Sequence, residues 1–283
     1  MNEVVLNNGV KMPQLGFGVF QVTDAKVCKD SVLAALKAGY RLIDTAAAYG
    51  NEEAVGEAIR ESGIPRDELF ITTKLWVQDA SYEKAKKAIQ TSLQKLGLKT
   101  LDLYLIHQPM GDYYGAYRAM EEAYDQGILR AIGVCNFYPH VLADFCETVR
   151  VIPAVDQVEL HPFFQQENAL QLMKHYGVHP EAWGPFAEGN HNIFQHPVLT
   201  AIGKKYGKSA AQVALRWNLE RGVIVIPKST HADRIAQNMD VWDFQLSEED
   251  HKAIAALDVG HSEIVNHYDP AFVQMLHGLK IHD

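Results

Sequence analysis

The sequence has few cysteines and less positive than negative charge. Its three cysteines, Cys28, Cys135 and Cys146, are an odd number at spacings that match no metal motif. We therefore expect reduced thiols rather than disulfides or a thiolate metal site. Lys and Arg number 26 against 35 Asp and Glu, which gives a net charge of −9. A chain this acidic has no electrostatic attraction for nucleic acid, so an anionic ligand must be bound by a local basic site.

Long apolar runs are also missing. No stretch approaches the roughly 18 consecutive apolar residues that cross a bilayer. The N-terminal segment MNEVVLNNGVKMPQLGFG lacks the basic region followed by an apolar core that is typical of a signal peptide. We therefore expect a cytoplasmic protein without a membrane or nucleic-acid partner. Its expected oligomeric state is a monomer, with a weak dimer as the alternative.

A glycine-rich phosphate loop is the third absence. Gly16-Phe17-Gly18 does not continue to GxGxxG, which argues against an open doubly wound sheet, where such a loop usually follows the first strand. What the sequence does contain is a strict alternation of strand and helix patterns. The predicted strands are Gly16–Val19, Arg41–Thr45, Leu69–Leu75, Leu101–His107, Ala131–Val134, Ala154–Glu159, Val178–Trp183 and Val223–Pro227.

Helical patterns fill the segments between these strands. Small and apolar residues recur at helical spacing from Ala85 to Leu96 and from Ala210 to Trp217. Asn51 and Ser247 stand where the caps of two further helices are expected. Eight strand–helix units without a linker predict an α/β fold, a (β/α)8 TIM barrel, as a single domain over residues 1–283.

The two ends of the chain lie outside this repeating pattern. Asn7-Asn8-Gly9 separates two short apolar runs, which predicts an N-terminal β-hairpin. Such a hairpin would cap the bottom of the barrel. The residues from about 261 onward mix aromatic and polar side chains without a clear period, and we expect them to form an irregular tail.

Four polar residues fall at or just after the ends of three successive predicted strands. Asp44, Lys74 and His107 stand at strand ends, and Tyr49 lies in the loop five residues after Asp44. Catalytic residues of TIM barrels come from this end of the strands, so we expect the four to meet. The set suits proton donation to a carbonyl group, because a nearby lysine lowers the pKa of a phenol and a neutral histidine can hydrogen-bond the carbonyl oxygen. Each residue alone would more often be a cap, a packing residue or a solvated charge.

At these positions the sequence resembles the aldo-keto reductase family, in particular its compact bacterial members of the diketogluconate-reductase and methylglyoxal-reductase kind. The likeness runs from about Leu6 to Leu257. Its motifs are Gly39–Ala46 with Tyr49–Glu52, Thr73–Trp76, Asp102–His107, Ile226–Ser229 and Arg234–Asn238. The resemblance implies an NADPH-dependent oxidoreductase that reduces aldehydes and ketones to alcohols, among them small dicarbonyls, keto sugars and aromatic aldehydes.

The resemblance also implies a role for each of these groups. Hydride would pass from the nicotinamide of NADPH to the substrate carbonyl, with Tyr49 as the general acid. Lys74 and Asp44 would tune that tyrosine, and His107 would position the carbonyl. The substrate pocket would be formed by Phe20, Tyr49, Trp76, His107 and Gln108.

Two groups of residues are expected to bind the cofactor. The resemblance implies that Asn136 and Gln157 hold the nicotinamide amide and that Trp183 stacks on its ring. It also implies that the adenosine 2′-phosphate is bound by Lys228, Ser229 and Arg234. The adenine would lie near Gln237 and Asn238. Independently, a predicted helix start beside two cations suits a phosphate, although two unrelated surface cations would give the same pattern.

The sequence departs from the family at four positions around the site. Cys135, Gln108 and Gly184 stand where serine, tryptophan and serine are usual, and Asp156 replaces an asparagine. These departures bear on the substrate and on cofactor affinity rather than on the reaction class. We expect no metal site, because one Asp and one His make poor metal ligation.

Two other functions fit parts of the sequence. Some members of this fold family are channel-associated subunits that bind the cofactor without turnover. Loss of one of the four polar residues would favour that function, but all four are present. A hydrolase on the same barrel would need paired carboxylates or a metal cluster, and Asp156 and Glu159 have no partner that the sequence can place.

Overall fold

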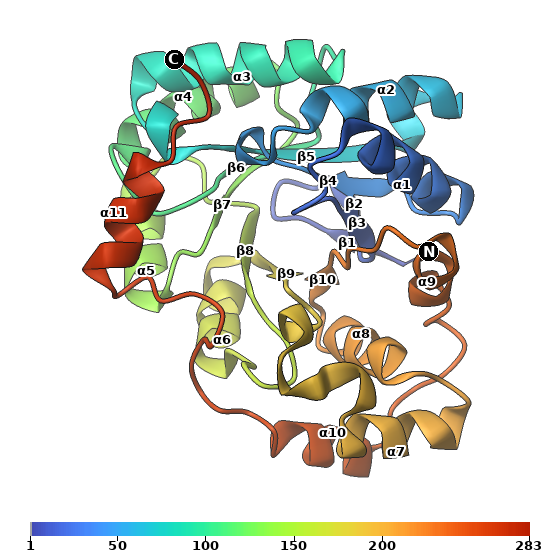
Figure 1. Cartoon of the computed structure of the whole chain (residues 1–283). Coiled ribbons are helices and arrows are strands. Elements are labelled where there is room, and N and C mark those ends of the chain that lie inside the picture. The colour runs from blue at the N-terminus through green and yellow to red at the C-terminus, as the bar shows by residue number, and fades with distance from the viewer. Residues whose placement is uncertain (1) are drawn as a thin grey trace.

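The computed structural model describes residues 2–283 and consists of a parallel eight-stranded sheet surrounded by helices (Figure 1). Each strand pairs with its neighbour in chain order. The strands are β3 (Gly16–Gly18), β4 (Leu42–Asp44), β5 (Phe70–Leu75), β6 (Leu103–Ile106), β7 (Ile132–Cys135), β8 (Val155–Glu159), β9 (His179–Trp183) and β10 (Ile224–Val225). All eight predicted strands are therefore present, most of them shorter than the apolar runs that predicted them.

The first and last strands approach each other to complete the ring. Leu15 forms a parallel bridge with Val225, and the backbone N–H of Gly18 donates to the carbonyl of Pro227 at 3.1 Å. A side-chain carbon on Gly18 would lie 2.9 Å from the carbonyl oxygen of Ile226, so only glycine permits this close approach. The predicted (β/α)8 barrel is confirmed.

Helices cover the outside of the barrel and bury one apolar face each. They are α1 (Ala25–Lys37), α2 (Glu52–Ser62), α3 (Tyr82–Leu96), α4 (Tyr113–Asp125), α5 (Pro139–Thr148), α6 (Glu167–Tyr176), α7 (Pro197–Tyr206), α8 (Ala210–Glu220), α9 (Ala232–Met239) and α10 (Glu248–Ala255). Ser247 forms a capping box with Asp250 at the start of α10, as predicted. Within residues 2–283, none of the helices combines the length and apolarity that crossing a membrane requires.

Short 3-10 helices occupy several of the connections. They are η1 (Ala47–Tyr49), η2 (Arg66–Glu68), η3 (Val77–Asp79) and η4 (Ala187–Gln195), the last of which contains several residues with non-helical backbone angles. Three of them, η1, η3 and η4, follow the carboxyl ends of β4, β5 and β9. The loops at that end of the barrel are therefore ordered by local turns.

The N-terminal hairpin covers the opposite end of the barrel. Strands β1 (Glu3–Val5) and β2 (Lys11–Pro13) pair antiparallel, which confirms the hairpin predicted from Asn7-Asn8-Gly9. The side-chain amides of Asn7 and Asn8 donate to the carbonyls of Pro153 and Arg130, each at 2.9 Å. Both carbonyls lie just before strands β8 and β7 begin, so the hairpin caps the amino ends of the strands.

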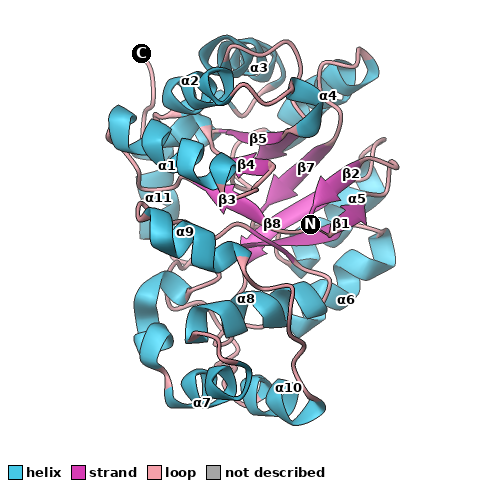
Figure 2. Ribbon diagram, turned by 90° about the vertical axis from the view of Figure 1, so that its right-hand side faces the viewer, coloured by secondary structure: helices cyan, strands magenta, loops and turns pink. Residues whose placement is uncertain are grey.

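The C-terminal tail crosses the other end of the barrel, far from the hairpin (Figure 2). The prediction of an irregular tail is wrong over helix α11 (Pro270–Gly278). Asp269 caps this helix by accepting from the N–H of Ala271 at 2.9 Å, and proline stands at its first position, where its missing N–H costs nothing. The helix buries Leu276 against Trp76 and Met110, which explains its formation.

Candidate active site

Asp44, Tyr49, Lys74 and His107 lie together at the carboxyl ends of β4, β5 and β6. Lys74 Nζ lies 2.6 Å from Asp44 Oδ1 and 3.3 Å from the Tyr49 hydroxyl. It also donates to the carbonyl of Thr45 at 3.1 Å. The rings of Tyr49 and His107 meet edge to face with centroids 5.5 Å apart. The arrangement is a continuous contact chain from a carboxylate through an ammonium to a phenol, beside an imidazole.

A buried asparagine fixes the loop that carries Tyr49. Asn51 was expected to cap helix α2, but its side chain makes no cap hydrogen bond. Its amide donates instead to the carbonyls of Val19 and Val22 at 3.0 and 3.1 Å, and its oxygen accepts from the Thr45 hydroxyl at 2.7 Å. These bonds join the loops after β3 and β4, so Asn51 sets the position of the tyrosine rather than the start of the helix.

Lys74 and Asp44 form an ion pair that is shielded from solvent. Burial alone would lower the pKa of Lys74, but the adjacent Asp44 carboxylate outweighs it and raises that pKa. Burial raises the pKa of Asp44, and Lys74 and a hydrogen bond from Gln157 oppose the rise. The lysine therefore stays an ammonium at neutral pH.

The pKa of Tyr49 differs from the expectation. Burial raises the pKa of Tyr49 to about 12, and Lys74 only partly offsets it, so the pKa lies above rather than below that of a free phenol. Burial, together with the charge of Lys74, lowers the pKa of His107 well below its usual value. At neutral pH the site thus holds a protonated phenol and a neutral imidazole.

A cavity of about 620 Å³ opens beside these groups. All five residues predicted for the substrate pocket line it: Phe20, Tyr49, Trp76, His107 and Gln108. The ring of Phe20 lies 5.0 Å from that of Tyr49, and the ring of Trp76 lies 5.2 Å from that of His107. Aromatic side chains therefore surround the hydroxyl and the imidazole on two sides.

Three residues predicted to contact the nicotinamide line the same cavity: Asn136, Gln157 and Trp183. Asn136 has a left-handed backbone conformation with φ 61°, which asparagine tolerates better than most residues. Its amide donates to the carbonyl of His107 at 3.2 Å, and its oxygen accepts from the indole N–H of Trp183 at 2.8 Å. The strained backbone thus places a polar side chain between the ends of three strands.

The predicted adenosine-binding residues begin at the cavity and extend away from it. Lys228 follows β10 and lines the cavity. Ser229 lies before helix α9, where its hydroxyl accepts from the N–H of His231 at 3.1 Å. The remaining three residues are on α9, outside the cavity wall, with two side chains exposed and the third buried: Arg234, Gln237 and Asn238.

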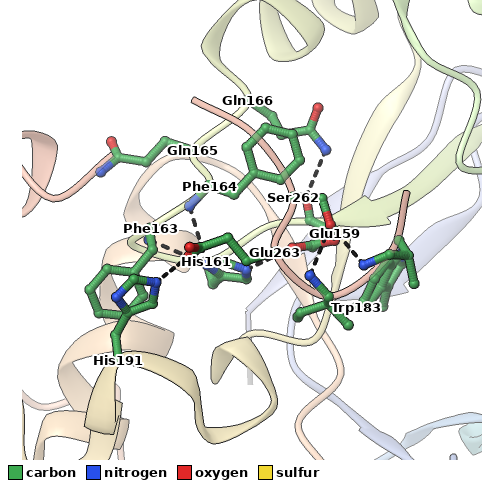
Figure 3. A network of polar contacts seen from close by, with 12 residues as sticks. Glu159, His161, Phe163, Phe164, Gln165, Gln166, Trp183, His191, Ser262 and Glu263 are labelled. Carbon is green, nitrogen blue, oxygen red and sulfur yellow. Dashed lines mark hydrogen bonds and ion pairs between the residues drawn. The ribbon is translucent and has the colours of Figure 1, made fainter. Parts of the chain in front are cut away.

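The tail is the part of the site that the sequence did not reveal. Its start is anchored to the carboxyl end of β8, where Glu159 lies between His161 and Ser262 (Figure 3). Ser262 donates to Glu159 Oε2 at 2.5 Å. His161 Nδ1 accepts backbone N–H groups of Phe163 and Phe164, so Nε2 carries the proton and donates to Glu159 Oε1 at 3.0 Å. The buried carboxylate is therefore satisfied from both sides.

From this anchor the tail forms one wall of the cavity. His267 Nε2 lies 2.8 Å from the side-chain oxygen of Gln108, and the Tyr138 hydroxyl lies 3.0 Å from His267 Nδ1. The indole N–H of Trp76 donates to the carbonyl of Leu279 at 2.8 Å. The spacing of Phe272 and Leu276 on one helical face was the only available signal for this wall. The tail contributes further lining residues, among them Ile264, Val265, Met275 and Leu279.

Comparison with known proteins agrees with this geometry. A family model described as the aldo/keto reductase family matches residues 14–259. A glyoxal reductase of Bacillus subtilis is 48% identical over 256 residues, which cover 90% of this chain and 92% of the relative. A methylglyoxal reductase of Escherichia coli is 43% identical over 260 residues, covering 91% and 94%.

A solved structure extends the comparison to the fold. A crystal structure of a Bombyx mori aldo-keto reductase in complex with NADP has a TM-score of 0.89 at 35% identity, and the match covers 94% of this chain and 95% of that one. The family model spans well over half of the present chain. The chain belongs to the aldo/keto reductase family, and it is an oxidoreductase of carbonyl compounds.

Proposed function

We propose that this protein reduces aldehydes and ketones with NADPH and that Tyr49 donates the proton. The observation that carries the proposal is the contact chain from Asp44 through Lys74 to the Tyr49 hydroxyl. The chain of contacts ends at a cavity with aromatic walls. We further propose that residues 1–283 act as one barrel domain, as a monomer in the cytoplasm.

The residues of the cavity fit NADP(H), the cofactor of this family. Asn136 and Gln157 present amide groups that match the donor and acceptor atoms of a carboxamide. Trp183 offers an indole face on the same wall, on which a flat ring can stack. When bound, NADPH supplies the hydride that the carbonyl carbon accepts.

The residues of the chain orient the carbonyl and supply the second hydrogen. The neutral imidazole of His107 has one N–H with which to hydrogen-bond the carbonyl oxygen. The Tyr49 hydroxyl transfers its proton to that oxygen, so the carbonyl becomes an alcohol once the carbon has gained its hydride. The resulting phenolate lies beside the Lys74 ammonium, 3.3 Å away, which stabilises it in a buried site.

The cavity favours small or flat carbonyl compounds. Its walls are mainly aromatic and aliphatic, and polar side chains such as Tyr49, His107 and Gln108 gather at the reactive end. We therefore propose small dicarbonyls, keto sugars and aromatic aldehydes as the substrate class. The glyoxal and methylglyoxal reductases among the relatives support small dicarbonyls as the first compounds to assay.

Replacement of Tyr49 by phenylalanine tests the mechanism. Phenylalanine keeps the ring but removes the proton, so we expect kcat with methylglyoxal and NADPH to fall roughly 100- to 10,000-fold, the contribution of a general acid. The dissociation constant of NADPH should change less than about 2-fold, because the lost hydroxyl is proposed to act on the carbonyl substrate and a change below the worth of one hydrogen bond is expected. Tyr176→Phe is the matched control, because that hydroxyl contacts Glu147 on the outer helices. Retention of most of the rate by Tyr49→Phe would show that another group donates the proton.

The basic residues after β10 are proposed to select NADPH over NADH. Lys228 and Arg234 are exposed and flank the start of α9, where charge and N–H groups suit a phosphate. The double substitution Lys228→Ala/Arg234→Ala should raise the KM for NADPH far more than that for NADH. Equal increases for the two cofactors would contradict the assignment of the 2′-phosphate. Lys84→Ala/Lys87→Ala, on the distant helix α3, is the charge-matched control.

A further inference from the structure

Glu181 is a buried acid that the proposed mechanism does not use. It lies in β9 with its side chain fully shielded from solvent. The side-chain nitrogen of Gln157 donates both to Glu181 Oε2 and to Asp44 Oδ2, each at 2.9 Å. Within residues 2–283, the second oxygen, Oε1, has no hydrogen-bond partner. Burying an acid in this environment costs free energy. We therefore looked for a function of Glu181 in the neighbouring site.

The two acids together determine how the Gln157 amide is oriented. A primary amide has two N–H bonds and one oxygen, and here Asp44 and Glu181 take one N–H each. The amide oxygen is the atom that remains for the cavity, which Gln157 lines. We propose that Glu181 is a positioning residue that fixes the Gln157 amide with its oxygen toward the nicotinamide carboxamide. This inference rests on the proposed function.

The neighbouring asparagine explains why this orientation matters. The oxygen of Asn136 already accepts the indole N–H of Trp183 at 2.8 Å. The oxygen of Gln157 is therefore available as a side-chain acceptor for the N–H2 of a nicotinamide carboxamide. If the amide were reversed, a nitrogen donor rather than an oxygen acceptor of Gln157 would face that N–H2 group, and this hydrogen bond would be lost.

The charge of the site agrees with this role. Burial raises the pKa of Glu181 to about 8, and the charge of Asp44 adds to the effect. At neutral pH the side chain is therefore an uncharged acid that accepts a hydrogen bond. Lys74 is already paired with Asp44, so a neutral Glu181 adds an acceptor without adding an uncompensated charge.

Two substitutions distinguish the hydrogen-bond acceptor of Glu181 from the space that its side chain fills. Glu181→Leu removes the acceptor, whereas Glu181→Gln keeps a neutral oxygen of nearly the same shape. We expect Glu181→Leu to weaken NADPH binding roughly 5- to 10-fold, the effect of one hydrogen bond, and Glu181→Gln to stay within about 2-fold of the parent on the same scale. Binding of 2′,5′-ADP, which lacks the nicotinamide, should be unchanged in both variants.

Coupling to Gln157 gives a second readout. If Glu181 acts through Gln157, the double variant Glu181→Leu/Gln157→Leu should bind NADPH no more weakly than Gln157→Leu alone. Additive losses would overturn the inference, as would equal weakening of NADPH and 2′,5′-ADP, which would indicate general structural damage. If the parent protein reduces methylglyoxal and the Glu181→Leu variant binds NADPH as tightly as the parent, only the proposed role of Glu181 is overturned. A parent protein that neither binds nor oxidises NADPH would overturn the proposed function as well.

Discussion

Replacing Lys74 with methionine tests how the buried ion pair serves proton donation. Methionine is unbranched and flexible, as the lysine stem is, but has no charge. The substitution removes the ammonium that lies 3.3 Å from the Tyr49 hydroxyl and leaves Asp44 without its partner in a buried site. Because an unpaired buried carboxylate is destabilising, the companion variant Asp44→Asn/Lys74→Met removes both charges together.

The size of the effect follows from Coulomb's law. Two unit charges 3.3 Å apart interact by about 5 kcal/mol at an effective dielectric constant of about 20. If about half of the phenolate charge has developed in the transition state, the loss is about 2.5 kcal/mol, or roughly 60-fold in rate. Full development of the charge would raise the loss to several thousand-fold. We therefore expect kcat to fall by at least about 50-fold in Lys74→Met. The fall should be smaller in Asp44→Asn/Lys74→Met, because the charge of Asp44 opposes formation of the phenolate.

The assay is the oxidation of NADPH by methylglyoxal, with alcohol oxidation by NADP+ measured in parallel. The oxidation direction requires the phenolate, and the pKa of Tyr49 is already about 12. Loss of Lys74 raises that pKa further, so the pH profile of alcohol oxidation should move upward in pH. Lys86→Met, on the surface of α3, should leave both directions unchanged. A kcat within a few-fold of the parent, with an unshifted profile, would refute a role for Lys74 in stabilising the phenolate.

Two further predictions concern the anchor of the tail and the helix that precedes it. Ser262→Ala removes the hydrogen bond to Glu159 and should lower the free energy of unfolding by about 1–2 kcal/mol. It should also raise the KM for carbonyl substrates more than it lowers kcat. Burial alone would raise the pKa of Asp250, but hydrogen bonds from Lys205 and Tyr206 lower it from 3.8 to about 2. Asp250→Asn should therefore cost roughly 2 kcal/mol at neutral pH, and this difference in urea unfolding should vanish as the pH falls from 3.8 toward 2. A pH-independent difference would contradict the depressed pKa.

The barrel and the catalytic end of its strands were predictable because both follow from short-range patterns. Strands buried on both faces appear as short apolar runs, and helices appear as amphipathic segments between them. Asp44, Lys74 and His107 interrupt or end three such runs, and parallel strands bring their carboxyl ends to one rim. Placement at the rim therefore needs no long-range information. Predicting the pKa of Tyr49 does need long-range information. Burial raises this pKa and Lys74 lowers it, and the balance of the two effects depends on packing from several strands.

The tail and Glu181 were beyond prediction for different reasons. The tail has no repeating partner in the sequence, and α11 forms because Leu276 and Phe272 pack on Trp76. That contact joins residues about two hundred positions apart, which periodicity cannot detect. Glu181 lies in the middle of a short strand and shares the side-chain direction of Trp183. The proposed role of its carboxyl group depends on a hydrogen bond from Gln157 on the neighbouring strand. No sequence motif indicates that contact.

Three of the four departures from the family pattern fall into two physical groups. Gly184 has φ 58°, where a serine would be strained, and Asp156 is a buried carboxyl whose pKa burial raises well above its usual value. A neutral carboxyl at that position accepts a hydrogen bond from the N–H of Phe137 as an asparagine oxygen would, so these departures preserve the local structure.

Gln108 is different, because its oxygen accepts from His267 in the tail. A tryptophan at 108 would leave that ring nitrogen without its acceptor, so the pocket wall and the tail must change together. We therefore propose that substrate selection in this protein depends on the Gln108–His267 pair, whereas the proposed proton donation by Tyr49 depends on the strand ends.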